Sequence, residues 1–262
     1  MREVEARART VAEAAPPEDA VAPLWTQPEW SERFAWLVQG TTGAGSADEP
    51  FDLGLFGSQP VGSVMARWRA LREATAMPVA LHARQVHRGK VAWHTTRPES
   101  PGLFVTEGVD GHATDVVGLL LTVSVADCVP VSIVDETRRT VALLHAGWRG
   151  VAAGIVEQGI ERLRAAGSRT EALWLHCGPA ICGRCYEVGP EVHRAVHPDR
   201  PAPAAPTPID LRAAITERAA EAGIEPSQIT LSAHCTRCGP GAFFSHRAGS
   251  PARQMGVLGV RP

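Results

Sequence analysis

Short apolar runs separated by polar turns dominate the middle of the chain. Residues 116–125, 129–134 and 140–144 are rich in valine and leucine, and a polar turn separates the last two. Apolar runs of this length, bounded by turns, are typical of buried strands. Two later runs of the same kind extend the prediction toward the C-terminus, at Leu173–Cys177 and Ile229–Ala233.

Helical periodicity alternates with these runs. Apolar residues recur at helical spacing over Val64–Ala74, Gly150–Ala166 and Ile209–Gly223, and Gly167 gives a C-cap signal for the second of these. Helices that alternate with strands, without an internal repeat, predict an α/β (α+β) fold. We therefore expect a single compact domain with a mixed β-sheet flanked by helices.

The N-terminus and two internal segments are polar and rich in proline or glycine. Residues 1–23 combine Ala, Glu and Arg with two adjacent prolines, so we expect a flexible N-terminal tail before a domain that spans residues 24–262. The glycine-rich segment 40–57 is expected to form a mobile loop, and the proline-rich segment 199–208 a surface connection. None of these segments is assigned to the core.

Composition and charge exclude several classes of protein. With 44% hydrophobic and 21% charged residues, the chain is neither disordered nor fibrous. Its 26 basic and 28 acidic residues give a net charge of −2, which argues against nucleic acid or a membrane as a partner. Neither an apolar stretch of about 18 residues nor a secretory signal is present, which predicts a cytoplasmic protein. Lys90 is the only lysine, so Schiff-base chemistry is not expected.

One cysteine and two histidines are the first candidates for chemistry. Cys128 lies between two predicted strands, His145 ends the next one, and His87 lies in a polar segment that can reach the same edge. Two imidazoles and a thiolate suit zinc, and three protein ligands leave a fourth position for water or substrate, as in catalytic zinc sites. Blue copper would need a weak axial ligand such as methionine, and none closely follows Cys128 or His145. The alternative is a buried apolar cysteine with two structural histidines.

Two Cys-x-x-Cys pairs form a second candidate. Cys182 and Cys185 make the first pair, and Cys235 and Cys238 make the second, with 49 residues between the pairs. Four cysteines could form a zinc site, although a compact zinc ribbon has roughly 15–20 residues between its pairs. The alternative is that all four are unconnected thiols in loops.

Other motifs are absent or weak. The chain has no P-loop and no Gly-x-Ser-x-Gly elbow. Arg149, Arg247 and Arg253 follow or lie within glycine-containing segments, which can present a guanidinium group to a phosphate. Each is otherwise a surface or structural arginine.

Five segments in chain order form a set that spans most of residues 36–260. They are Gln85-Val86-His87, Ala126-Asp127-Cys128-Val129-Pro130-Val131, His145-Ala146-Gly147-Trp148-Arg149-Gly150, Gly178-Pro179-Ala180-Ile181 with Cys185-Tyr186-Glu187-Val188-Gly189, and Cys235-Thr236 with Phe243-Phe244-Ser245-His246-Arg247. The second and third segments are highly specific. As a set, the segments resemble the bacterial polyphenol-oxidase (laccase-domain) purine nucleoside phosphorylase family.

The resemblance implies a metal held by His87, Cys128 and His145, with zinc favoured and copper as the alternative. It implies phosphorolysis of adenosine, inosine and methylthioadenosine, with adenosine deamination as a side activity, so purine nucleosides and phosphate are the expected partners. In this interpretation His87, Cys128 and His145 are catalytic. The older family name records a copper-linked oxidase activity on phenols. Multicopper oxidases use paired His-x-His motifs, and this chain contains none.

Three further residues are assigned roles within this expectation. Asp127 moves a proton or orients a ligand imidazole, or else closes the turn between two strands. Arg149 and Arg247 are the candidates for holding phosphate. Cys185 matches a family cysteine near the site, without an assigned role.

Departures from the family pattern leave other functions open. The family's Thr-x-Arg-x-Gly-Gly-like loop corresponds here to residues 41–46, which lack that arginine, and its Asn-Arg pair corresponds to Ala66-Arg67. A metal- and nucleoside-binding protein with impaired catalysis is therefore one alternative, and a copper-linked polyphenol oxidase is another. Cys182 and Cys238 lie outside the general pattern. The oligomeric state is not determined by the sequence.

Overall fold

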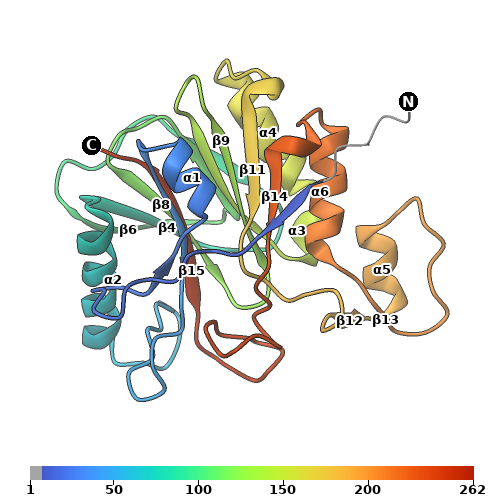
Figure 1. The fold of residues 1–262 in the computed structure, drawn as a ribbon, viewed down its shortest axis with the longest axis horizontal. Coiled ribbons are helices and arrows are strands. Elements are labelled where there is room, and N and C mark those ends of the chain that lie inside the picture. Colours follow the sequence, from blue (N-terminus) through green and yellow to red (C-terminus); the bar gives the residue numbers. More distant parts are fainter. Residues whose placement is uncertain (1–7) are drawn as a thin grey trace.

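Two β-sheets pack face to face, and helices cover their outer faces (Figure 1). The computed structural model describes residues 8–262. In Figure 1, helix α2 flanks one side of the sheet pair, and helices α4, α6 and α3 flank the other.

The first sheet has seven strands in the order β1-β14-β11-β9-β10-β7-β5. Its strands in chain order are β1 (Arg9–Val11), β5 (Val91–His94), β7 (Gly111–Thr114), β9 (Val129–Asp135), β10 (Val141–Ala146), β11 (Leu173–Cys177) and β14 (Ile229–Ser232). Strands β9, β10 and β11 pair antiparallel, whereas β14 runs parallel to both β11 and β1. The sheet is therefore mixed.

The second sheet has six strands in the order β2-β3-β15-β8-β4-β6. Its strands are β2 (Leu24–Trp25), β3 (Leu37–Thr42), β4 (Val79–Arg84), β6 (Gly102–Glu107), β8 (Leu119–Val125) and β15 (Gln254–Val260). A separate two-stranded ribbon is formed by β12 (Glu187–Val188) and β13 (Thr207–Pro208).

The two sheets share one apolar core. Val134, Val141 and Leu143 of the first sheet are fully buried in the same cluster as Leu121 and Leu258 of the second. Because both inner faces are removed from water, these strands are apolar along most of their length. This shared core fixes the position of the loops at the ends of both sheets.

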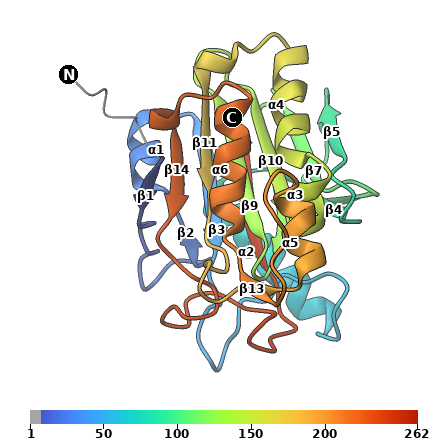
Figure 2. The same cartoon turned by 90° about the vertical axis from the view of Figure 1, so that its right-hand side faces the viewer.

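Helices bury the two outer faces. The helices are α1 (Pro28–Arg33), α2 (Val61–Thr75), α3 (Trp148–Ala152), α4 (Ile155–Ala165), α5 (Pro190–Val196) and α6 (Leu211–Glu221), with short 3₁₀ turns at Thr170–Ala172 and Pro226–Gln228. Figure 2 shows α4, α6, α3 and α5 in front of the first sheet. Trp68 and Leu71 of α2 pack on the second sheet. In the described part of the chain, no helix combines the length and the apolar character needed to cross a membrane.

The α/β (α+β) fold class predicted from the sequence is confirmed, and the strand predictions in the middle of the chain coincide with β8, β9, β10, β11 and β14. The helix predicted over 150–166 is two helices, α3 and α4. They separate at Gly154, which has a φ of +76°. Glycine tolerates this left-handed conformation, which interrupts the helix. The break was not predicted, because the residues on both sides of Gly154 continue the same helical pattern.

The expected single mixed sheet is in fact two sheets, and glycine interrupts the apolar pattern of two strands of the second sheet, β3 and β15. Gly40 lies within β3, so the predicted loop over 40–57 begins only after Thr42. In β15, a Cβ at Gly256 would lie 2.6 Å from the Pro130 side chain, and one at Gly259 would lie 2.6 Å from Met77. Close packing therefore requires glycine where a strand pattern would show an apolar residue.

The expected tail over residues 1–23 also needs correction for the part that the structure describes. Residues 9–11 form β1 and pair with Thr230–Ser232 of β14. Glu13 is buried and accepts hydrogen bonds from Ser232 Oγ at 2.7 Å and His176 Nε2 at 3.0 Å. The segment pairs with the edge strand β14 through backbone hydrogen bonds. Such pairing does not depend on an apolar sequence pattern, so the sequence did not predict it. Residues 1–7 of the predicted tail lie outside the described residues.

Candidate functional site

Three of the predicted site residues, His87, Cys128 and His145, line one pocket of about 510 Å³. The pocket lies at one end of the sheet pair, and its walls come from both sheets and from the loops around 52–57 and 246–253. Pockets of this size suit small molecules. The residues that were predicted from separate segments are therefore brought together.

Adjacent strands explain why Cys128 and His145 meet. Cys128 directly precedes β9, His145 lies near the end of β10, and the antiparallel register places His145 opposite Pro130. Gly147 is next to this pair, and a Cβ there would lie 3.0 Å from Cys128 Sγ and 3.8 Å from the His87 ring. Glycine at this position leaves open the space that the three side chains share.

His87 is held by Asp110, a residue that the sequence did not single out. The buried Asp110 carboxylate accepts four backbone N–H groups, those of residues 86, 87, 88 and 89, at 2.6–2.9 Å. The Asp110 carbonyl also accepts the His145 N–H at 2.7 Å. A carboxylate bound by successive N–H groups fixes the loop, even though His87 adopts a φ of +58°. Asp110 thus positions both histidines.

The side chains at the pocket are of the types that metal ions bind. The His87 and His145 rings are edge-to-face, with centroids 4.8 Å apart. His145 Nδ1 is buried and has no hydrogen-bond partner among the described residues. Burial, together with His87, lowers the pKa of His145 to about 3, so its imidazole is neutral at pH 7. A neutral imidazole with an unpaired nitrogen has the form that a metal ligand requires.

Cys128 adds a thiol that needs a cation to ionise. Burial, reinforced by Asp127, raises the pKa of the Cys128 thiol to about 12. A bound metal ion would stabilise the thiolate, as expected for a coordinating cysteine. His87, Cys128 and His145 are therefore the residues that could hold a metal at this pocket, and their chemistry suits zinc.

Both carboxylate oxygens of Asp127 are engaged in hydrogen bonds with neighbouring loops. Asp127 adopts a φ of +84°, and its carboxylate accepts hydrogen bonds from Thr236 Oγ1 and from the Arg247 backbone N–H, both at 2.6 Å. Its carbonyl accepts the Ile181 N–H at 3.1 Å. These bonds occupy both carboxylate oxygens, so the geometry favours a positioning role that connects Cys128 to two loops.

The two arginines predicted for phosphate do not line the pocket. The exposed Arg149 guanidinium lies 4.2 Å from the Trp148 ring centroid. Arg247 lies over Tyr186 and donates to the Glu187 carbonyl at 2.9 Å. Arg84 and Arg253 line the pocket instead. Arg253 was noted in a glycine-containing segment, and Arg84 lies three residues before His87, which is the signal that could have found it.

Three more lining residues were given no role from the sequence, although Gln85 stands in one of the five segments that carry the resemblance. Phe56 is 68% exposed on the loop beside Arg84. The side-chain amide of Gln85 accepts the Ser124 N–H at 2.6 Å and donates to the Ser124 carbonyl at 3.0 Å. These two bonds join the His87 segment to β8. Burial lowers the pKa of His82 to about 4, which keeps this lining imidazole neutral. These residues come from the second sheet and its loops, which the sequence pattern hides.

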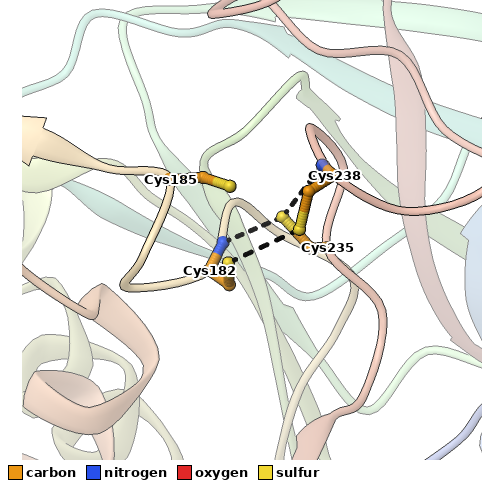
Figure 3. A group of neighbouring side chains, drawn as sticks. All are labelled: Cys182, Cys185, Cys235 and Cys238. Carbon is orange, nitrogen blue, oxygen red and sulfur yellow. Dashed lines mark hydrogen bonds between the residues drawn. The ribbon is translucent and has the colours of Figure 1, made fainter.

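The four remaining candidates, Cys182, Cys185, Cys235 and Cys238, also come together (Figure 3). Their sulfur atoms all lie within 4.8 Å of one another. Burial raises the pKa of the Cys235 thiol, but the backbone N–H groups of Cys238 and Cys182 outweigh it and lower that pKa to about 7. The four thiols therefore lie together, as a shared metal site requires.

Comparison with known proteins supports the resemblance drawn from the sequence. A model of the family described as multi-copper polyphenol oxidoreductase laccase matches residues 41–261 of the chain. The chain is 33% identical over 255 residues to purine nucleoside phosphorylase YlmD of Geobacillus stearothermophilus, which covers 87% of this chain and 92% of that protein. It is 36% identical over 160 residues to adenosine deaminase RL5 of an unknown prokaryotic organism, 58% of this chain and 59% of that protein, so this match spans less than two thirds of the relative.

Solved structures confirm the fold. The crystal structure of YlmD from Geobacillus stearothermophilus matches with a TM-score of 0.83 at 27% identity, over 95% of this chain and 100% of that chain. The Bacillus licheniformis hypothetical protein YfiH matches with a TM-score of 0.83 at 24% identity, over 94% of this chain and 98% of that chain. The two-sheet architecture is thus shared with these proteins.

Proposed function

We propose that this chain, which belongs to the multi-copper polyphenol oxidoreductase laccase family, is a zinc-dependent purine nucleoside phosphorylase that acts on adenosine, inosine and methylthioadenosine. The observation that carries the proposal is the pocket in which His87, Cys128 and His145 meet, with a buried and unpaired nitrogen on His145. The names of the phosphorylase relatives supply the substrate class.

The pocket offers the groups that a nucleoside and a phosphate need. The exposed ring of Phe56 provides a face on which a purine can stack. Arg84 and Arg253 line the same pocket, and guanidinium groups bind phosphate through paired hydrogen bonds. We therefore assign phosphate to Arg84 and Arg253, and purine to the Phe56 loop.

In the proposed reaction, a phosphate oxygen attacks the ribose C1′ while the bond from C1′ to the purine nitrogen breaks. The electron pair of that bond leaves with the base, which takes up a proton. The second product is ribose 1-phosphate from adenosine or inosine, and 5-methylthioribose 1-phosphate from methylthioadenosine. Arg84 and Arg253 hold the attacking anion in line, which lowers the entropic part of the barrier. A zinc ion held by His87, Cys128 and His145 would supply a Lewis acid at the same pocket.

Adenosine deamination is the proposed side activity. Water replaces the exocyclic amino group of the purine, giving inosine and ammonia, so both reactions use a purine nucleoside in the same pocket. The relative named adenosine deaminase RL5 supports this assignment. The neutral imidazole of His82, which is not one of the proposed metal ligands, supplies a proton acceptor on the pocket wall.

Nucleoside turnover with and without phosphate tests the proposal. Zinc-loaded protein is expected to release hypoxanthine from inosine only when phosphate is present, and Cys128→Ala is expected to lose more than about 100-fold in kcat/KM. Cys177→Ala is the matched control, because Cys177 is a buried cysteine of β11 that does not line the pocket. No turnover of any of the three nucleosides by the zinc-loaded protein would contradict the proposal and favour a binding protein.

The phosphate assignment has its own test. Arg84→Ala is expected to raise the KM for phosphate by about 10-fold, whereas Arg149→Ala changes it by less than about twofold. The reverse result would restore the assignment made from the sequence. The family description also names phenol oxidation, so metal content and phenol turnover of protein purified without added copper test the oxidase alternative.

A further inference from the structure

A second group of thiols lies outside the pocket, on two loops that are distant in the sequence. Cys182 and Cys185 follow β11, and Cys235 and Cys238 follow β14 (Figure 3). An isolated parallel bridge between Ala180 and Cys235 joins the two loops, and the Thr236 N–H donates to the Ala180 carbonyl at 3.1 Å. The two loops continue from adjacent parallel strands, which explains why pairs 49 residues apart meet.

The backbone of both loops is folded around the sulfur atoms. The N–H groups of Cys182 and Cys238 donate to Cys235 Sγ at 3.3 and 3.4 Å. The first loop turns back through a bond from the Cys185 N–H to the Cys182 carbonyl at 2.9 Å, and the second through a bond from the Gly239 N–H to the Cys235 carbonyl at 3.0 Å. A Cβ at Gly239 would collide with that carbonyl oxygen, so the tight turn requires glycine.

We propose that Cys182, Cys185, Cys235 and Cys238 bind one structural zinc ion, separate from the metal of the pocket. Four sulfur atoms within 4.8 Å of one another match the closed tetrahedral set of a structural zinc site, and no position is left for substrate. Each thiol binds as a thiolate, so four protons pass to solvent and no electrons are transferred. Cys238 is exposed, which gives the ion a path of entry.

Positive charge lies beside the cluster. A zinc ion with four thiolates has a net charge of −2, and the Arg237 guanidinium donates to the Cys185 carbonyl at 3.1 Å, between the two loops. Arg184 lies within the first Cys-x-x-Cys pair. These cations reduce the electrostatic cost of gathering four thiolates.

The proposed ion also supports the pocket. Thr236 lies directly after Cys235, and its hydroxyl donates to Asp127, the neighbour of Cys128. Asp127 also accepts the Arg247 N–H, so the loop that carries His246 is tied to the same carboxylate. A zinc ion at the four cysteines would therefore hold in place a chain of contacts that ends next to the pocket.

Metal content in four variants tests the proposal independently of catalysis. We expect about two zinc ions per chain in the wild type, about one in Cys238→Ser, about one in Cys128→Ser and none in the double variant. Cys177→Ala, which removes a thiol from neither site, is expected to keep both ions. An ion count that Cys238→Ser leaves unchanged would overturn the proposal, whereas an unchanged count in Cys128→Ser would overturn only the pocket metal.

Spectroscopy and mass measurement provide the second readout. In Cys128→Ser loaded with Co²⁺, the tetrathiolate predicts intense sulfur-to-metal charge-transfer absorption, which Cys238→Ser in the same background removes. The principal competitor is oxidation, because Cys182 Sγ and Cys238 Sγ lie 3.9 Å apart. Protein prepared anaerobically that binds no Co²⁺ at these thiols would overturn the proposal. A loss of four hydrogens in mass under air while zinc is present would overturn it in favour of two disulfides, with oxygen as the oxidant.

Discussion

The pocket and the four-cysteine cluster both gather side chains of the types that bind metals, yet they are built in opposite ways. The pocket offers three donors, an exposed His87 and a cavity of about 510 Å³, and its scaffold is the Asp110 carboxylate. The cluster offers four thiols within 4.8 Å, on loops that turn around their own sulfur atoms. An incomplete donor set beside a cavity favours chemistry, and a complete set favours structure.

Chelation should separate the two regions most strongly. The three-donor site is open to solvent and is expected to lose its metal first, because the four thiolates of the cluster hold zinc more firmly. Activity is expected to fall more than about 100-fold while about one zinc ion per chain remains and Tm changes by less than about 5 °C. Zinc content, activity and Tm measured along one chelator titration check this. Simultaneous loss of both ions, or of activity and fold together, would break the comparison.

Asp110→Asn tests whether hydrogen bonds, rather than metal, build the pocket. The amide retains one acceptor oxygen and loses the charge that binds four N–H groups, so we expect a loss of about 2–3 kcal/mol in unfolding free energy. His87 would be less well positioned, with a loss of about 10–100-fold in kcat/KM. Urea unfolding and steady-state kinetics measure the two effects. The exposed Asp115→Asn is the control, and an equal loss in that variant would refute a specific role for Asp110.

The pH dependence of stability should report the buried histidines on the pocket side. Burial lowers the pKa of His82 to about 4 and that of His112 to about 3. Below pH 6.5 the unfolded chain binds protons that these folded imidazoles exclude, so stability falls as the pH decreases from 6.5 to about 4. Each histidine contributes up to about 1.4 kcal/mol per pH unit. In urea titrations between pH 7 and pH 5, His112→Asn should reduce this slope; an unchanged slope would exclude His112 as a source.

The site residues at the ends of adjacent strands could be predicted from the sequence, whereas the residues that hold them in position could not. Cys128 and His145 were found because the turn from β8 to β9 and the end of β10 have clear apolar patterns. Asp110 was not found, because its role depends on four N–H groups more than 20 positions away in the chain. The apolar pattern predicts which residues of a strand are buried, but it does not predict which distant backbone N–H groups a carboxylate such as Asp110 will bind.

Sequence spacing was a poor guide to which residues lie together, both at the four-cysteine cluster and at the pocket. The 49 residues between the cysteine pairs argue against a compact zinc ribbon, but they do not keep the pairs apart, because β11 and β14 are parallel neighbours that bring their following loops together. Arg84 and Phe56 were missed because the sequence analysis assigned no strand over Val79–Arg84 and placed Phe56 in a segment expected to be a mobile loop. Long-range sheet pairing determined the site more than local sequence did.

The pairing of β1 with β14 has a consequence for the order in which the protein can be completed. Glu13 and Ser232, which share a hydrogen bond, are 219 positions apart, so the segment around Glu13 waits for β14 to leave the ribosome. At about 5–20 residues per second, translation imposes a delay on the order of tens of seconds. During that time the Glu13 carboxylate remains hydrated, and this edge of the sheet can close only after β14 has been synthesised.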